Sequence, residues 1–417
     1  MIYTNRHITD RGGSWMSWLL MPLLLVCLTA CSSSDDQYQE VNPEAANGES
    51  APEKAATKLY IYVYSPEVPE VTRAATYDGD VNEVGNEASV YSIQIWVFTH
   101  TSHKLIGYYA PTSTPGLSKD TPYDLLQLTI DDHYAETPEA ERENVDVYVL
   151  GNVTPETCNV TLDENTTSEQ LEAAIMAKTT LDPFGVTSPV RSVPEDVGLP
   201  MSGVLRNQPV TGSAPVLRLD EGGEIATVML RRIVSKLRFA FSKEEGSEAL
   251  HINSIKLNSE MIPMSEYIFM SEAEPYDRHT CHIKTADGYD ETVSELLDEP
   301  LDDVAENELP VYYAWRHEEL TPAEYESRID NAARDGYLTQ RVFYLRESDK
   351  LLTGTIKYQI GEGEEQTATF RMVDEGGFSR NHVWTVYAYQ AHARLHLVVA
   401  DVTPWNPTMF DYEFYNW

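Results

Sequence analysis

Two stretches of the chain carry histidine and cysteine in patterns that could bind zinc. HEELT begins at His317 like the helix of a zinc protease, but Thr321 stands where the second histidine is needed. RHTCHIK places His279 close to Cys281 and His282, yet no matching second pair of ligands is evident elsewhere. We therefore expect no zinc site and no metalloprotease activity.

Two further motifs resemble binding loops but lack essential residues. DGDVNEVGNE spaces Asp78, Asp80 and Asn82 like calcium ligands, but its sixth position is not glycine and Ser89 replaces the bidentate glutamate. GEGEEQ (361–366) lacks the third glycine of a dinucleotide-binding loop and lies between strand patterns. The sequence thus predicts a protein without catalytic residues, metal or cofactor.

The N-terminus indicates export and a lipid anchor. Arg6 and Arg11 precede the apolar run LLMPLLLVCLTA, which is too short for a comfortable membrane span and is typical of a secretory signal. The run ends in LTAC, which is similar to a bacterial lipobox with Cys31 as the lipidated residue. We expect an outer-membrane lipoprotein precursor, anchored by lipid and exposed at the cell surface.

The net charge argues against two classes of partner, and the cysteines leave one disulfide open. A formal net charge of −37 repels nucleic acid and anionic lipid, so we expect a binder of neither. Cys158 and Cys281 remain beyond the signal region; they could pair in an oxidising compartment, but sequence does not give the distance between them.

Strand patterns dominate the rest of the chain. KLYIYVYS places Leu59, Ile61 and Val63 on one face of an edge-like strand and three tyrosines on the other. SVYSIQIWVF and LIGYYA flank a short connection and predict a hairpin. TSEQLEAAIMAK predicts a helix, because Thr167 and Gln170 form a capping box. The fold class is therefore all-β with few short helices.

We divide the chain into four parts. They are a signal peptide (1–31), a flexible acidic tether (32–57), an N-terminal β-sandwich domain (58–222) and a C-terminal β-sandwich domain with a C-terminal strand (223–417). The Pro/Gly-rich stretch at 186–215 is the expected place for the boundary or for a long loop within a domain.

Several short blocks, in this order, resemble the fimbrillin family, the fimbrial subunit lipoproteins that build type V pili in Bacteroides-type bacteria. The blocks are the lipobox before an acidic tether, YSIQIWVF (91–98), VYVLGN (147–152), LPMSG (199–203), LRRIVSKL (230–237), VFYLRE (342–347), SRNHVWTV (379–386) and VTPW (402–405). Ser235 replaces the alanine usual in the family's Leu-x-Arg-x-x-Ala-Lys strand.

The resemblance implies two transthyretin-like β-sandwich domains and a mode of assembly. In polymerising fimbrillins an arginine-specific protease cuts the loop after the first strand, and a strand from a neighbouring subunit fills the groove that opens. By this resemblance the cut would fall between Arg73 and Ala74, and the displaced strand would carry Leu59, Ile61 and Val63.

The C-terminus FDYEFYNW has a two-residue period that serves two structures. Phe410, Tyr412 and Phe414 share one face, while Asp411 and Glu413 share the other. The segment could be the donor strand that enters a neighbouring subunit, or it could close the protein's own C-terminal sheet.

We therefore interpret the chain as a structural fimbrial subunit rather than an enzyme. It would assemble with other fimbrial subunits in a homo- or heteropolymer and support surface adhesion, and it could bind a host or bacterial surface ligand. The alternative is a monomeric surface lipoprotein that binds glycan or host ligand through exposed aromatic side chains.

Overall fold

The computed structural model describes residues 56–65, 86–118, 121, 123–158, 160–178, 184–185, 190–270, 281–292, 295–307, 331–372 and 378–404. All of them lie within one compact unit of the chain. Strands dominate and helices are short, which confirms the all-β fold class. No helix among the described residues is long and apolar enough to cross a membrane.

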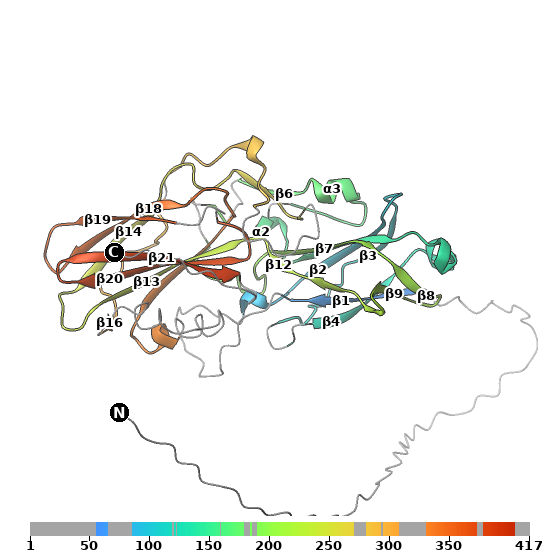
Figure 1. Ribbon diagram of the computed structural model, residues 1–417, viewed down its shortest axis with the longest axis horizontal. Coiled ribbons are helices and arrows are strands. Elements are labelled where there is room, and N and C mark those ends of the chain that lie inside the picture. Colours follow the sequence, from blue (N-terminus) through green and yellow to red (C-terminus); the bar gives the residue numbers. More distant parts are fainter. Residues whose placement is uncertain are drawn as a thin grey trace, which may run out of the picture. The chain divides into compact units, whose positions relative to one another are not determined.

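The first two sheets form one sandwich (Figure 1). The six-stranded first sheet contains β1 (Lys58–Tyr64), β4 (Tyr123–Thr129), β8 (Val210–Ser213), β9 (Val216–Glu221), β10 (Glu224–Ile225) and β11 (Thr227–Met229). The five-stranded second sheet contains β2 (Ile93–Thr99), β3 (Leu105–Tyr109), β5 (Val145–Gly151), β7 (Met201–Gln208) and β12 (Arg231–Arg232). Side chains from both sheets meet in one buried core, because alternate residues of each strand face inward.

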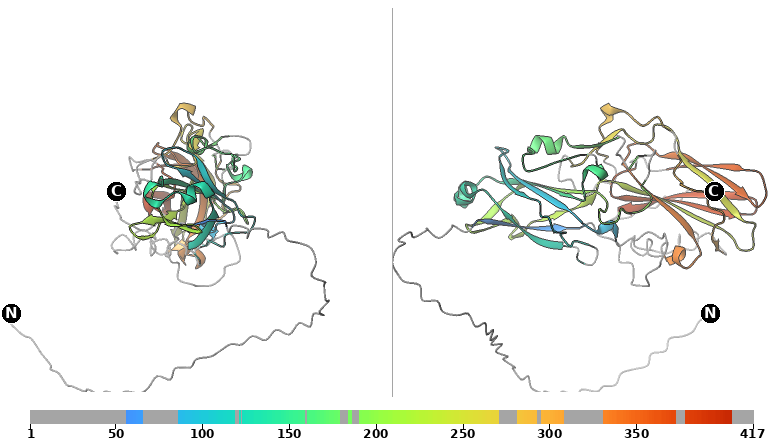
Figure 2. Two further views of the ribbon diagram at one scale, coloured as in Figure 1. Left: turned by 90° about the vertical axis from the view of Figure 1, so that its right-hand side faces the viewer. Right: turned by 180° about the vertical axis from the view of Figure 1, so that it is seen from behind.

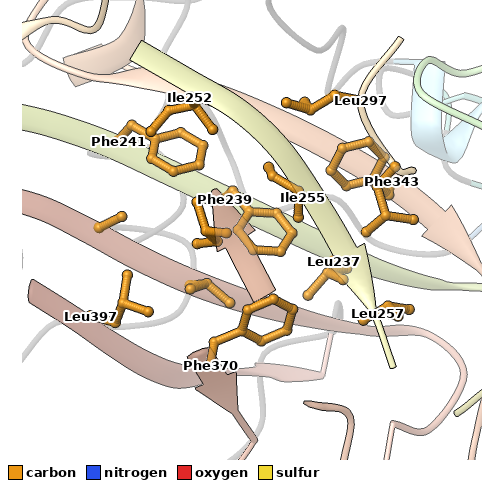
Figure 3. Close-up of a cluster of buried hydrophobic side chains, with 14 of the residues drawn as sticks. Leu237, Phe239, Phe241, Ile252, Ile255, Leu257, Leu297, Phe343, Phe370 and Leu397 are labelled. Carbon is orange, nitrogen blue, oxygen red and sulfur yellow. The ribbon is translucent and has the colours of Figure 1, made fainter. Parts of the chain in front are cut away.

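Two more sheets form a second sandwich. The third sheet contains β13 (Ser235–Glu244), β16 (Glu306–Asn307), β17 (Thr339–Leu345), β20 (His382–Ala391) and β21 (Arg394–Pro404), and the fourth contains β14 (Leu250–Leu257), β18 (Thr353–Ile360) and β19 (Gln366–Arg371). Its core is rich in aromatic rings: Phe239 lies 5.2 Å from Phe370 and 5.9 Å from Phe343, measured between ring centroids (Figure 3). Figure 2 shows these layers from two further directions.

Short elements connect the sheets. β6 (Ile175–Ala177) pairs with β15 (Ser265–Tyr267). The helices whose full bounds lie within the described residues are α1 (Asp132–Glu136), α2 (Pro155–Cys158), α3 (Ser168–Glu172) and the 3-10 turns η1 (Asn86–Ala88), η2 (Glu139–Glu141) and η3 (Thr285–Asp287). A third apolar cluster covers the outer face of the second sheet with residues from these connections and from β17 and β20. β5 is buried along its whole length for that reason.

Two predicted elements differ from those observed. The capping box at Thr167 is present, but α3 ends at Glu172, and Ile175–Ala177 forms a strand because it pairs with β15. Part of the Pro/Gly-rich stretch at 186–215 forms β7 and β8 rather than a loop. β10, β11 and β12 follow residue 222 in the chain but pair with strands of the first two sheets. The division into four parts with a domain boundary after residue 222 stays a prediction.

Candidate functional site

The strand β1 lies inside the first sheet, not at its edge. All seven of its residues pair with β4 in antiparallel register, from Lys58 opposite Thr129 to Tyr64 opposite Tyr123. Its other side pairs in parallel with β9 over the first half and with β11 over the second half. The prediction of an edge-like strand was therefore wrong, because a two-residue period defines the faces of a strand but not its neighbours.

Within the described residues, β1 holds the first sheet together. β4 and β11 form strand pairs with β1 alone, and β9 carries β8 and β10 on its far side. Without β1 the sheet would separate into β4, β11 and the group β8–β9–β10. A sheet built this way requires a strand at the β1 position.

The predicted faces of β1 are confirmed by burial. Leu59, Ile61 and Val63 are 0% exposed, whereas the tyrosines between them are half-buried on the opposite face. Leu59 lies between Leu128 and Leu217 on the neighbouring strands, and each of these three leucines is fully buried. Burial of each aliphatic side chain stabilises the fold by about 1.5–3 kcal/mol relative to exposure.

The backbone of β1 and its flanking residues adds bonds on both sides. Lys58 N donates to Pro215 O at 3.0 Å, and Leu230 N donates to Tyr64 O at 2.9 Å. On the β4 side, Ile130 N donates to Thr57 O at 3.2 Å. Removing β1 would leave buried donors and acceptors unpaired on three strands, a costly arrangement unless another strand replaced it.

The other predicted site residues lie outside the described part of the chain. They are the lipidation residue Cys31, the cleavage residues Arg73 and Ala74, and the donor-strand residues Phe410, Tyr412 and Phe414. In sequence, Arg73 falls between Ser65, just after β1, and Asn86, where η1 begins. The cleavage and donor roles therefore stay predictions.

A buried polar cluster surrounds Glu87, a residue of η1. The Glu87 carboxylate accepts from Lys236 Nζ at 2.8 Å and from the Tyr344 hydroxyl at 2.6 Å, and Arg232 Nε donates to the Glu87 carbonyl at 2.8 Å. Arg232 also donates to Asn381 Oδ1 at 3.1 Å. The cluster thus joins η1 to strands of the second and third sheets.

The charge state of Glu87 follows from these contacts. Burial alone would raise the pKa of this carboxyl, but the charges of Lys236 and Arg232 and the hydrogen bonds from Lys236 and Tyr344 outweigh burial and lower it. Glu87 is therefore ionised at neutral pH and satisfied by cations, as a buried structural ion pair requires. Sequence reasoning missed this site because Glu87 lies 149 residues from Lys236 and 257 from Tyr344 along the chain.

A second buried polar cluster centres on Glu347. Its carboxylate accepts from Arg380 Nε at 2.9 Å and from the His282 backbone N–H at 2.8 Å, while Glu347 N donates to Glu266 Oε2 at 3.0 Å. Burial and the nearby charge of Glu347 raise the pKa of Glu266 well above its ordinary value. Burial and the charge of Arg380 lower the pKa of His282 to about 4.

This second cluster contains Cys281 and His282 of the RHTCHIK segment, whereas His279 lies outside the described residues. Cys281 Sγ donates to the Ser348 carbonyl at 3.2 Å, and His282 Nδ1 lies 3.8 Å from Glu347. The described residues contain no group of three or more metal-ligating side chains. No disulfide joins Cys158 to Cys281 in the described part of the chain.

No family model and no curated protein sequence matches this chain. Solved structures of fimbrial proteins are similar to it. The tip fimbrial protein Mfa3 from Porphyromonas gingivalis, solved with a C-terminal truncation, is 12% identical with a TM-score of 0.45, over 83% of this chain and 100% of that one. A fimbrial assembly protein from Parabacteroides distasonis is 12% identical with a TM-score of 0.40, over 84% of this chain and 97% of that one. Both of these neighbours are fimbrial proteins.

Proposed function

We propose that this chain is a structural fimbrial subunit that assembles by strand exchange at the β1 position. It is exported as a lipoprotein through Cys31 and held at the outer membrane until its first strand is removed. Cleavage between Arg73 and Ala74 then frees β1, and an extended strand from another subunit takes its place. The assembled fimbrium supports adhesion at the cell surface.

The observation that carries this proposal is the position of β1. It lies between β4 on one side and β9 and β11 on the other, with three aliphatic side chains fully buried. An incoming strand at this position gains backbone bonds on both sides and fills an apolar slot. An edge strand would offer a newcomer only one bonding side.

The sequence of the following connection supports cleavage there. Arg73 is the only lysine or arginine between Pro66 and Gly85, so an arginine-specific protease has one target in this connection. Beyond that target, Glu87 is held by Lys236 and Tyr344. After the cut, the contacts of Glu87 would still hold the new N-terminal region of the chain in place. β1 would no longer be covalently joined to the rest of the subunit.

The C-terminal segment is the proposed donor. It follows β21, which ends at Pro404, and its residues Phe410, Tyr412 and Phe414 would enter a neighbouring subunit. A head-to-tail contact of this kind does not close on itself, so it propagates as a filament.

The proposal is tested by gel migration of surface material, heated mildly or boiled, from cells making four forms of the protein. The wild type should give a ladder after mild heating and a single band after boiling, because donor-strand contacts survive mild heat. Arg73→Ala should abolish the ladder, and deletion of Pro407–Trp417 should remove it if the tail is the donor. Arg73→Lys serves as the control for cleavage specificity.

Each result has one meaning. A ladder that persists in Arg73→Ala would refute cleavage at this residue. If the deleted chain still folds, as measured by circular dichroism, and its ladder is unchanged, the tail is not the donor strand. The alternative that it closes the protein's own C-terminal sheet would then be favoured. A wild type without any ladder would refute the polymeric role.

A further inference from the structure

The core filled by β1 differs in composition from the other two. Tyr134 is the one aromatic among its buried residues in the described chain, and the rest are aliphatic. The second sandwich and the third apolar cluster bury many Phe, Tyr and Trp rings, such as Phe239, Trp384 and Trp96. The slot under β1 is therefore lined by branched aliphatic side chains.

The neighbours of each inward residue of β1 show the same character. Leu59 lies opposite Leu128 and Leu217, while Ile61 lies opposite Leu126. All these side chains are at most 6% exposed, so the slot has little spare room. Protein cores are close-packed, and larger side chains in such places force strain or movement of the backbone.

From this packing we infer that the β1 slot selects a donor strand with aliphatic side chains at three alternate positions, and that this strand comes from a different subunit rather than from a copy of this chain. The inference rests on the proposed removal of β1. The donor must run antiparallel to β4 and parallel to β9 and β11, because only that direction restores the bonds that β1 makes.

The chain's own tail does not match the slot. Aligned with β1, Phe410, Tyr412 and Phe414 would take the places of Leu59, Ile61 and Val63 in turn.
 Three aromatic rings would then replace three smaller aliphatic side chains. The other face of the tail offers Asp411 and Glu413, whose charges cannot enter an apolar core without a large penalty.

Another alternating aliphatic strand of the chain is already in use. β21 presents Leu395 and Leu397 on one face, but both are buried in the core of the second sandwich. A copy of this chain could donate β21 only by opening that core. A subunit of different sequence therefore donates the strand that fills the β1 slot of this chain. The tail of this chain donates to the slot of a subunit other than a copy of itself.

The test uses the mature full-length chain with a recognition sequence for a site-specific protease inserted between Arg73 and Ala74. After cleavage, the protein is incubated with labelled peptides, and the bound label and the released N-terminal fragment are measured by size-exclusion chromatography and mass spectrometry. The peptides are the β1 segment Lys58–Tyr64, the native tail Met409–Trp417 and the tail carrying F410L, Y412I and F414V. A tail carrying D411Y and E413Y controls for changes on the outward face.

The β1 peptide and the aliphatic tail should replace the cleaved strand, and the native tail and the control tail should bind at least roughly tenfold more weakly, since overpacking opposes them. Equal exchange of native and aliphatic tails would overturn the selectivity and leave strand exchange standing. Failure of the β1 peptide itself to exchange into fully cleaved protein would overturn the proposed function.

A second measurement keeps the inference falsifiable in the uncut protein. The triple variant L59F, I61F and V63F is compared with Y60F, Y62F and Y64F, which alters only the outward face. The inward variant should show a lower thermal midpoint than both the wild type and the outward variant, because three rings must be fitted into the close-packed slot. An unchanged midpoint in the inward variant would show that the slot accepts aromatic rings and would refute the selectivity.

Discussion

At the scale of single residues, Glu87 and Lys236 show how a buried charge can be structural. Their side chains are 0% and 1% exposed and lie 2.8 Å apart. A buried ion pair adds little net stability over an apolar pair, but the loss of one partner leaves the other charge without compensation. The pair therefore fixes the position of η1 against the third sheet rather than supplying a large driving force.

Lys236→Met should destabilise the protein strongly. We expect a loss of about 3–5 kcal/mol, measured by urea unfolding, because the charge of Glu87 would remain buried with less compensation. Lys357→Met is the matched control, since Lys357 also lies 2.8 Å from a glutamate, Glu365, but both side chains are exposed. The control should unfold at the wild-type urea concentration, and equal effects of the two changes would contradict the role assigned to burial.

His282 should make stability depend on pH. Its pKa falls from 6.5 in the unfolded chain to about 4 in the fold, first because of burial and then because of the charge of Arg380, despite the opposing charge of Glu347. The unfolded state therefore binds the proton first, so this contribution is complete above pH 6.5 and is lost as the pH falls toward 4. The expected loss is about 2–3 kcal/mol.

His282→Asn isolates this contribution from that of Glu266. The raised pKa of Glu266 acts in the opposite sense, because protonation of that carboxyl favours the fold at low pH. Urea unfolding of both proteins at several pH values between 4 and 7 should show a smaller difference in stability between them at the lower end. A constant difference across the range would contradict the lowered pKa of His282.

At the scale of elements, close approach between strands constrains particular glycines. A Cβ at Gly203 on β7 would lie 2.7 Å from the Met229 carbonyl oxygen and 2.8 Å from Val228 Cγ1 on β11. Gly203 belongs to the LPMSG block, and β11 is one of the strands that β1 holds in the first sheet. The absence of a side chain therefore lets the two sheets of the first sandwich approach at this point.

Gly203→Ala should lower the thermal midpoint, because the backbone of β11 must move to admit the methyl group; we expect about 1–3 kcal/mol of destabilisation. Gly151→Ala is the control on a neighbouring strand, since its Cβ would meet Val90, Leu230 and Met201 at 3.4–3.6 Å, which is ordinary contact. A similar midpoint for the two variants, measured by differential scanning calorimetry, would show that the β11 backbone can move to admit the methyl group without loss of stability.

Elements also show where local pattern and tertiary pairing disagree. The stretch ATVMLRRIVSKLRFAF (226–241) has the composition of one continuous strand, yet it contributes to β11, β12 and β13 in three different sheets. The chain passes from the first sheet to the second at β12, which pairs with β7. It then enters the third sheet at β13, which pairs with β17 and β20. Alternation alone does not encode such changes of partner.

At the scale of the whole molecule, β1 forms strand pairs only within the first sheet. Loss of β1 should therefore affect one part of the molecule and spare another. In the cleaved protein with β1 exchanged out under mild denaturant, backbone amides of β4, β9 and β11 should exchange hydrogen rapidly, while those of β13 and β20 should stay protected. Mass-spectrometric hydrogen exchange would measure this, and uniform loss of protection would contradict the separation.

Features that depend on neighbouring residues in the chain could be predicted from the sequence. Two-residue periods identified the inward face of β1, the capping box located the start of α3, and the order of short blocks indicated the fimbrillin resemblance. Each of these signals lies within a few residues of the chain, where side-chain spacing translates directly into geometry.

Contacts between distant segments of the chain could be identified only in the folded structure. It placed β1 between β4 and the strands β9 and β11, and it brought Glu87 to Lys236 and Tyr344. These contacts join residues separated by tens to hundreds of positions, and a strand's period is the same at an edge and in the interior of a sheet. The sequence could therefore identify the face of β1 that is buried, but only the fold could show that β1 holds its sheet together from both sides.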